Sequence, residues 1–117
     1  MKKYEIPCDV IHLDTGWFEH DWQCDYKFSP ARFHDPAKMV QQLKESGYRI
    51  SLWQLPYFTP KNKYYEQLLK SGYAVQNEDG FLPTDDIILD YSNPDAVSWY
   101  QEKLADLLDM GVAAIKA

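Results

Sequence analysis

The sequence predicts an α/β fold built on a parallel sheet, and two observations support this. Three stretches place a glycine after a helical pattern and β-type residues after the glycine: KESGYRIS at 44–51, LKSGYAVQ at 69–76 and LLDMGVAAI at 107–115. This order is typical of the junction between a helix and the next strand of a wound sheet. Two pairs, Asp35-Pro36 and Asn93-Pro94, each put a capping side chain before a proline and so indicate where helices begin.

In the first half of the chain, the pattern predicts a strand, a helix and a second strand. Residues 8–14 form a short β-rich run that ends at Thr15-Gly16. A long loop follows, and the helix that starts at Asp35-Pro36 ends at Ser46-Gly47. Residues 50–55 are the second predicted strand, since they are rich in large apolar side chains and are stopped by a proline.

The second half predicts two helices, a small β excursion and a last strand. The first helix covers 62–71, and the excursion comprises 73–75 and an Asp79-Gly80 turn. A longer helix begins at Asn93-Pro94, and the last strand covers 112–115. The expected apolar stripe of the longer helix consists of Val97, Tyr100, Leu104, Leu107 and Leu108. The order is therefore strand, helix, strand, helix, small β unit, helix and strand, in one domain.

The composition narrows the range of partners. The 117 residues are enough for a small core but are about half of the roughly 250 of a complete α/β barrel. With 12 Lys and Arg against 18 Asp and Glu, the expected surface is acidic, so nucleic acid is not an expected partner. No apolar run approaches a membrane span and no leader is seen, which favours a cytoplasmic location without membrane contact. The 15% of aromatic residues fits a site for ring-shaped ligands.

No pattern in the chain predicts a cofactor or a metal. Neither GxGxxG nor GxxxxGK[ST] follows a predicted strand, so dinucleotide and P-loop phosphate sites are not expected. His12 and Asp14 share a face of the first strand, but a metal site needs a third ligand, and the other histidines lie in an irregular loop. We expect His12 to be packed and hydrogen-bonded. Cys8 and Cys24 form no CxxC pair and are expected to be packing residues.

Alternation along the strands sorts the side chains by face, because residues two apart point the same way. Each predicted strand ends with a polar or aromatic residue on one common face: Asp14, Trp53 and Lys116. Catalytic side chains of α/β barrels usually sit at these carboxyl ends. Each residue also has a simpler explanation. An Asp at a strand end often accepts backbone N–H bonds of a turn, a Trp often packs against other side chains, and a terminal Lys often extends into solvent. The rows expected on this face are Val10, His12 and Asp14; Ser51, Trp53 and Leu55; and Val112, Ala114 and Lys116.

Four stretches resemble consecutive blocks of the family 31 glycoside hydrolases, the α-glucosidase and α-xylosidase group. They are DVIHLDTGWF, LWQLPYF, LDYSNPDAVSWYQEKLADLLDMGV and the closing AIKA, and the match covers nearly the whole chain. The resemblance implies a (β/α)8 TIM barrel that cleaves α-glycosidic bonds with retention. It also implies that residues 1–117 are a single segment of that catalytic barrel, truncated at both ends, with about strands two to four and their helices.

The resemblance assigns substrate-binding roles to four residues. Asp14 would accept hydrogen bonds from the cleaved sugar, Trp53 would form an apolar wall, Lys116 would be a cation beside the nucleophile, and Thr15 would tune which sugar fits. The family's aspartate nucleophile directly follows a pair matching Lys116-Ala117, and its general acid lies further on. No catalytic residue is therefore expected within the chain. The implied parent protein hydrolyses an α-linked oligosaccharide or glycoside, and the chain alone is expected to be inactive.

Two other functions remain open. A non-catalytic carbohydrate-binding α/β module would use the aromatic loops and would need the 117 residues to close their sheet alone. A segment of another TIM-barrel hydrolase, such as a metal-dependent one, would need metal ligands that the pattern does not offer. In the barrel interpretation, the rest of the parent barrel is the main partner. Unpaired strand edges also predict self-association of the chain by itself.

Overall fold

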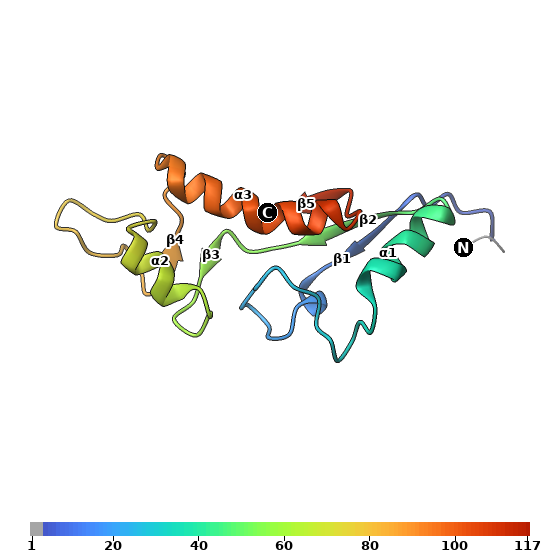
Figure 1. The fold of residues 1–117 in the computed structure, drawn as a ribbon, viewed down its shortest axis with the longest axis horizontal. Helices are drawn as coiled ribbons and strands as arrows, with labels where there is room; N and C mark the ends of the chain where they lie inside the picture. Colours follow the sequence, from blue (N-terminus) through green and yellow to red (C-terminus); the bar gives the residue numbers. More distant parts are fainter. Residues whose placement is uncertain (1–3) are drawn as a thin grey trace.

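The computed structural model describes residues 4–117. Within this range the elements are β1 (Val10–Leu13), the short 3-10 helix η2 (Thr15–Trp17), α1 (Pro36–Glu45), β2 (Arg49–Trp53), β3 (Tyr57–Phe58), α2 (Tyr65–Ser71), β4 (Ile87–Ile88), α3 (Pro94–Asp109) and β5 (Ala114–Lys116). The predicted order of β1, α1, β2, α2, α3 and β5 is confirmed, whereas η2 and β3 are additional elements. The molecule is elongated, with the strands β1, β2 and β5 towards one end and β3, β4 and α2 at the other (Figure 1).

The strands β1, β2 and β5 form a parallel sheet in the order β1-β2-β5, so the predicted parallel α/β arrangement is confirmed. One face of this sheet carries Ile50 and Leu52, which are buried together with Val40 of α1 and Leu107 of α3. Burying one such side chain contributes roughly 1.5–3 kcal/mol. The two helices therefore cover the same face, and the opposite face, which carries the predicted row of functional residues, is left open.

The two helix starts predicted from a capping side chain followed by a proline are confirmed. The Asp35 side chain accepts a hydrogen bond from the backbone N–H of Lys38 at 3.0 Å, and α1 begins at the proline that follows it. The Asn93 side chain accepts from the N–H of Asp95 at 2.9 Å, and α3 begins in the same way. Each cap satisfies a backbone donor that has no partner within the helix, while the proline loses no hydrogen bond there.

A second, smaller packing unit lies beyond the carboxyl ends of the sheet strands (Figure 1). The strands β3 and β4 pair antiparallel, and a single bridge joins Ala74 to Leu89. The predicted turn is present, since the N–H of Gly80 donates to the carbonyl of Asn77 at 3.0 Å with a Gly80 φ of +82°. The two-residue strand β3 was not predicted, because two residues carry no periodicity. An aromatic cluster fills the interior of the unit: Tyr26, Phe58, Tyr64, Trp99 and Tyr100.

Several predicted boundaries differ from the observed ones. The structure shortens the first strand at both ends, from 8–14 to Val10–Leu13, and the second strand, predicted at 50–55, begins one residue earlier and ends two residues earlier, at Arg49–Trp53. The structure starts the helix predicted at 62–71 at Tyr65, because the Asn62 side chain accepts from the N–H of Tyr64 and donates to the carbonyl of Cys24 instead.

Three apolar positions are also corrected. Leu55 and Val112 were expected on the open face of the sheet, but both are buried in the core. Each lies just outside its strand, where the chain turns and the two-residue alternation no longer holds. Leu108 was expected in the buried stripe of α3 but is 47% exposed, and the buried residues of that helix are Ala96, Trp99 and Leu107.

A test of the packing between α1 and the turn after α3 uses two glycines. Gly111 has a φ of +111°, and a Cβ there would lie 3.1 Å from Cγ1 of Val40, whereas a Cβ at Gly80 would meet nothing within 4 Å. Both Gly111→Ala and Gly80→Ala strain a left-handed backbone by about 1–2 kcal/mol. We expect Gly111→Ala to lower the free energy of unfolding by clearly more, since Val40 must also move. Urea denaturation measures the difference, and equal losses would contradict the close approach.

The open sheet face predicts that the chain associates in solution. Val10 on this face is 52% exposed, and within residues 4–117 the strands β1 and β5 each have one unpaired edge. Unpaired edges and apolar surface promote contact between chains. Light scattering should therefore report a mass above that of the 13.7 kDa chain. A compact monomer that melts cooperatively would contradict this prediction, because the open face would then be stable in contact with water.

Candidate functional site

The structure brings together the three residues predicted at the strand ends. Trp53 of β2 pairs in register with Lys116 of β5, and Asp14 directly follows β1. The Nζ atom of Lys116 lies 3.8 Å from Oδ2 of Asp14. Because all three side chains belong to the face that the helices leave open, a ligand approaching the carboxyl ends of the strands meets a carboxylate, an ammonium group and an indole.

Asp14 has one oxygen engaged and one available. Its Oδ1 accepts a hydrogen bond from the N–H of Thr15 at 3.0 Å, which caps the short helix η2. Its Oδ2 is 3.6 Å from Nε2 of His12 and 3.8 Å from Nζ of Lys116, both beyond hydrogen-bond distance. The side chains of Asp14 and Lys116 are 61% and 60% exposed, so water screens their attraction. Oδ2 is therefore free to accept from a ligand.

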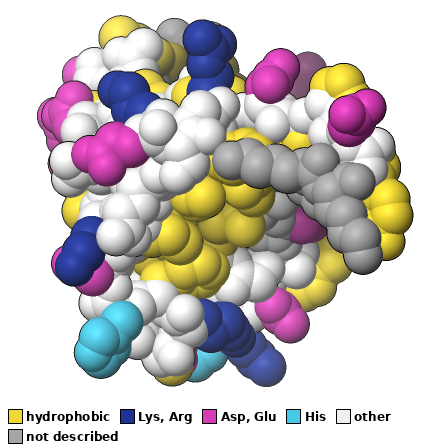
Figure 2. All heavy atoms as spheres, turned by 90° about the vertical axis from the view of Figure 1, so that its right-hand side faces the viewer, with side chains coloured by type: hydrophobic (Ala, Val, Ile, Leu, Met, Phe, Trp, Pro, Cys, Tyr) yellow, Lys and Arg dark blue, Asp and Glu magenta, His cyan; other side chains and the backbone are white. Residues whose placement is uncertain are grey.

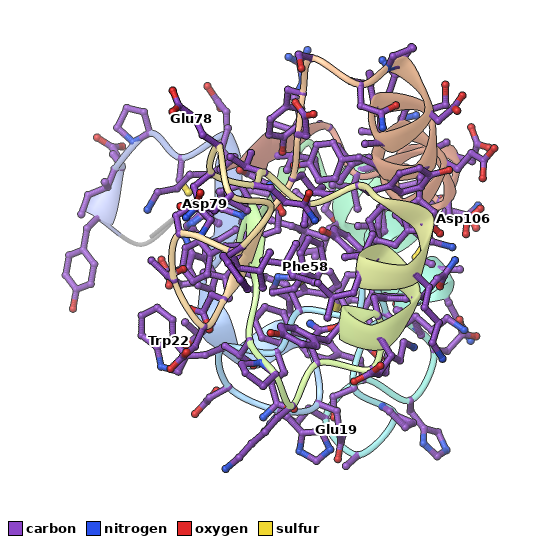
Figure 3. All side chains as sticks on the ribbon, turned by 90° about the vertical axis from the view of Figure 1, so that its left-hand side faces the viewer. Glu19, Trp22, Phe58, Glu78, Asp79 and Asp106 are labelled. Carbon is purple, nitrogen blue, oxygen red and sulfur yellow. The ribbon has the colours of Figure 1, made fainter. Side chains whose placement is uncertain are left out.

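Aromatic side chains form a wall beside Asp14. The Trp53 ring stacks on Phe18 at 6.1 Å between centroids and lies perpendicular to the Trp22 ring at 5.8 Å between centroids. The indole Nε1 of Trp17 donates to the carbonyl of Trp53 at 2.7 Å and so anchors the loop after β1 to the end of β2. In Figure 3, Trp22 lies at the periphery of the molecule, whereas Phe58 lies among packed side chains.

Sequence reasoning missed Trp22 as a member of this wall. Trp22 is 54% exposed and adopts a φ of +61°, a left-handed conformation that is uncommon for a bulky residue. Residues held in such conformations cluster at functional sites. The high aromatic content of the loops was the only signal in the sequence, and it did not identify this position.

The prediction for His12 is half right. Its Nδ1 lies 3.1 Å from Oγ of Ser51 on the neighbouring strand, so the side chain is hydrogen-bonded. It is not packed in the core, however, because it stands on the open face with 34% of its side chain exposed. Ser51 was expected on the same face and is found there, since β1 and β2 pair His12 with Ser51.

Two of the hollows in the described structure lie away from this cluster. One of about 580 Å³ opens between α1, α3 and the amino ends of the strands, and its apolar floor is visible in Figure 2. The catalytic sites of α/β barrels lie at the opposite end, so this hollow is not the candidate site. The other, of about 410 Å³, is lined by polar residues of the loops after β1 and β2: Glu19, His20, Gln23, Asp25, Lys61 and Lys63.

Other reactive groups in the described part of the chain have structural roles. Burial raises the pKa of the Cys24 thiol to about 12, so it stays protonated and is a poor nucleophile. The hydroxyl and backbone N–H of Ser92 both donate to Asp90 and lower the pKa of its carboxyl group. Residues 4–117 contain no group of three side chains suited to hold a metal ion. None of their helices is long and apolar enough to span a membrane.

Comparison with known families and proteins agrees with this arrangement. The description "Glycosyl hydrolases family 31 TIM-barrel domain" belongs to the family model that matches residues 1–117. The alpha-xylosidase XylQ of Lactiplantibacillus pentosus is 32% identical over 99% of this chain, and an alpha-xylosidase of Emericella nidulans is 31% identical over the same share. The chain spans 16% of the length of each of these relatives.

Solved structures share the fold. A GH31 alpha-xylosidase from a soil metagenome, complexed with xylose, matches 97% of this chain with a TM-score of 0.80 at 23% identity, over 18% of its own chain. The Flavobacterium johnsoniae GH31 dextranase, complexed with glucose, also matches 97% with a TM-score of 0.83 at 24% identity, over 15% of its own chain. Three parallel strands with helices on one face are thus embedded in larger proteins of this architecture.

Proposed function

The chain belongs to glycoside hydrolase family 31, as part of its TIM-barrel catalytic domain, and we propose that it supplies the sugar-binding wall of a retaining α-glycosidase. In this proposal, residues 1–117 contribute about the second to fourth barrel strands. The membership rules out the alternative of a segment from another barrel hydrolase. The single observation that carries the proposal is the convergence of Asp14, Trp53 and Lys116 at the ends of neighbouring parallel strands.

The chemistry of the three side chains suits a sugar. Oδ2 of Asp14 can accept from a sugar hydroxyl, and a ligand without that hydroxyl would leave the carboxylate without a partner. The Trp53 ring, backed by Phe18, offers a flat apolar surface to the C–H face of a sugar ring. Lys116 would favour the ionised form of a neighbouring carboxylate, which a nucleophile requires. Thr15, next to Asp14, would adjust which sugar fits.

We propose an α-linked xyloside or glucoside as the substrate, with the xyloside favoured. Two relatives that align with 99% of this chain are named alpha-xylosidases. A lysosomal alpha-glucosidase of Bos taurus is 26% identical over 91% of the chain, which keeps the glucoside as the second candidate. Xylose lacks the hydroxymethyl group of glucose, so the space beside Thr15 and Trp53 would decide between them.

The reaction needs groups that this proposal places outside the three strand ends. Retaining cleavage uses two carboxyl groups about 5–5.5 Å apart, one as nucleophile and one as acid and base. Among the described strands of the parallel sheet and the residue that follows each, Asp14 is the single carboxylate. Binding by this chain and cleavage by carboxylates elsewhere in the barrel together account for the activity.

Substitutions at Asp14 and Trp53 test the site in an active barrel that contains this chain. Asp14→Asn removes the charge of the acceptor, and we expect kcat/KM to fall about 10- to 100-fold, the scale of a hydrogen bond to a charged group. Trp53→Ala removes apolar contact and should weaken binding and change the preference between paired aryl α-xylosides and α-glucosides. Steady-state kinetics on both substrates gives the two effects separately.

The control for these variants is Tyr91→Ala, which truncates an aromatic side chain that is 50% exposed and lies outside the open sheet face. It should keep the kinetics of the unchanged protein. Wild-type kinetics for both site variants, or losses that only follow a lower melting temperature, would show that Asp14 and Trp53 are ordinary packing residues.

The chain by itself should not hydrolyse glycosides. Assays of the purified 117-residue chain with aryl α-xylosides and α-glucosides should give no turnover above buffer. Asp14→Ala is the matched control, because a contaminating glycosidase would be unaffected by it. Turnover that persists through purification and disappears in this variant would refute the proposal that this chain binds the sugar while carboxylates elsewhere in the barrel cleave it. Sugar binding by a chain that folds as a closed monomer would instead favour a non-catalytic carbohydrate-binding module.

A further inference from the structure

Ser51, His12 and Asp14 form a line across the open face of the sheet. The Oγ atom of Ser51 lies 3.1 Å from Nδ1 of His12, and Nε2 of the same ring lies 3.6 Å from Oδ2 of Asp14. The two ring nitrogens therefore face two different groups. In a neutral imidazole, one nitrogen carries a proton and the other accepts a hydrogen bond. The hydrogen bond at one nitrogen therefore determines whether the other nitrogen is a donor or an acceptor.

We propose that His12 is a positioning residue that orients the carboxylate of Asp14. In this proposal, Ser51 selects the tautomer of the His12 ring that does so. The Ser51 hydroxyl donates to Nδ1, which leaves the ring proton on Nε2, directed at Oδ2 of Asp14. The opposite tautomer would direct a lone pair at a carboxylate and is electrostatically unfavourable. This inference rests on the proposed function, because it assigns the purpose of the orientation to sugar binding.

The position of Asp14 explains why such support is needed. Its Oδ1 is fixed by the N–H of Thr15, but Oδ2 has no partner within hydrogen-bond distance among the described residues. A carboxylate held at one oxygen can still rotate, and the side chain is 61% exposed. A proton on Nε2 at one side and the Lys116 ammonium at the other restrict Oδ2 to the space between them. A hydroxyl that binds there needs no prior rearrangement, which strengthens binding.

We assign no nucleophilic role to Ser51. His12 approaches Asp14 only to 3.6 Å, so the three groups are not coupled by continuous hydrogen bonds. The contribution of Ser51 is to fix the ring, and that of His12 is to direct the carboxylate. Both are therefore expected to change the geometry and affinity of the site without taking part in bond cleavage.

Nuclear magnetic resonance of the chain tests this arrangement without any ligand. At about pH 8, above the ordinary pKa of histidine, the ¹⁵N shifts of the imidazoles report the tautomer. We expect His12 to carry its proton on Nε2 in the unchanged chain. Ser51→Ala should mix the two tautomers and move the ¹³C shift of the Asp14 carboxyl carbon. Ser51→Thr keeps the hydroxyl and should restore both signals.

Internal references and a matched variant control this experiment. Among the described residues, the imidazole rings of His20 and His34 make no hydrogen bond, so their tautomers should not respond to Ser51→Ala. Ser98→Ala, at an exposed position of α3, should leave His12 and Asp14 unchanged. An unchanged His12 tautomer in Ser51→Ala, or an unchanged Asp14 signal, would overturn the inference.

Titration with xylose and with methyl α-xyloside links the geometry to binding. Ser51→Ala should weaken binding about threefold to tenfold, the scale of one hydrogen bond, and Ser51→Thr should recover it. A changed tautomer with unchanged affinity would also overturn the positioning role. Failure of the unchanged chain to bind either sugar would count against the proposed function instead, and the ligand-free signals would still decide whether Ser51 and His12 orient Asp14.

Discussion

The parallel pairing of β2 with its two neighbours determines which side chains can meet. In a parallel pair, residues in register point to the same face, so the pairing of Trp53 with Lys116 and of His12 with Ser51 places all four on one side. A slip of one residue along β2 would turn Trp53 towards the helices and bring Leu52 to the open face. The site therefore depends on the register before it depends on any polar contact.

The buried face of the same sheet maintains that register. Ile50 and Leu52 are almost fully buried against Val40 and Leu107, so a slip would expose two large apolar side chains. At roughly 1.5–3 kcal/mol for each side chain, this cost exceeds anything the exposed ion pair of Asp14 and Lys116 contributes. Packing on one face fixes the geometry of the other, so the polar residues of the open face are not needed to hold the sheet in register.

Much of this arrangement could be predicted from the sequence because its signals are local. Capping by Asp35 and Asn93 needs only the next few residues, and alternation within a strand places Asp14, Trp53 and Lys116 on one face. The prediction failed just beyond the strand ends, where Leu55 and Val112 turn into the core. Alternation is a property of extended backbone, and it carries no information once the chain turns.

Long-range contacts were the part that local patterns could not supply. The contact of Trp22 with Trp53 joins residues 31 positions apart through a loop with a left-handed residue, and no periodicity marks such a conformation. The hydrogen bond between Ser51 and His12 depends on the register of two strands that are 39 positions apart at this point. Both contacts follow from the tertiary structure, and each adds a residue to the site that composition alone did not single out.

The exposure of Asp14 to water determines how strongly its carboxylate interacts with Lys116. Two unit charges 4 Å apart interact by about 1 kcal/mol in water but by about 4 kcal/mol at an effective dielectric constant near 20. Asp14 and Lys116 are each about three-fifths exposed, so the attraction between their charges across 3.8 Å is close to the weak value in water. A bound sugar ring, or further barrel strands facing the open side, would exclude water and strengthen the same contact without moving either residue. In the proposed site, the strands would provide the geometry and the enclosure would provide much of the binding energy.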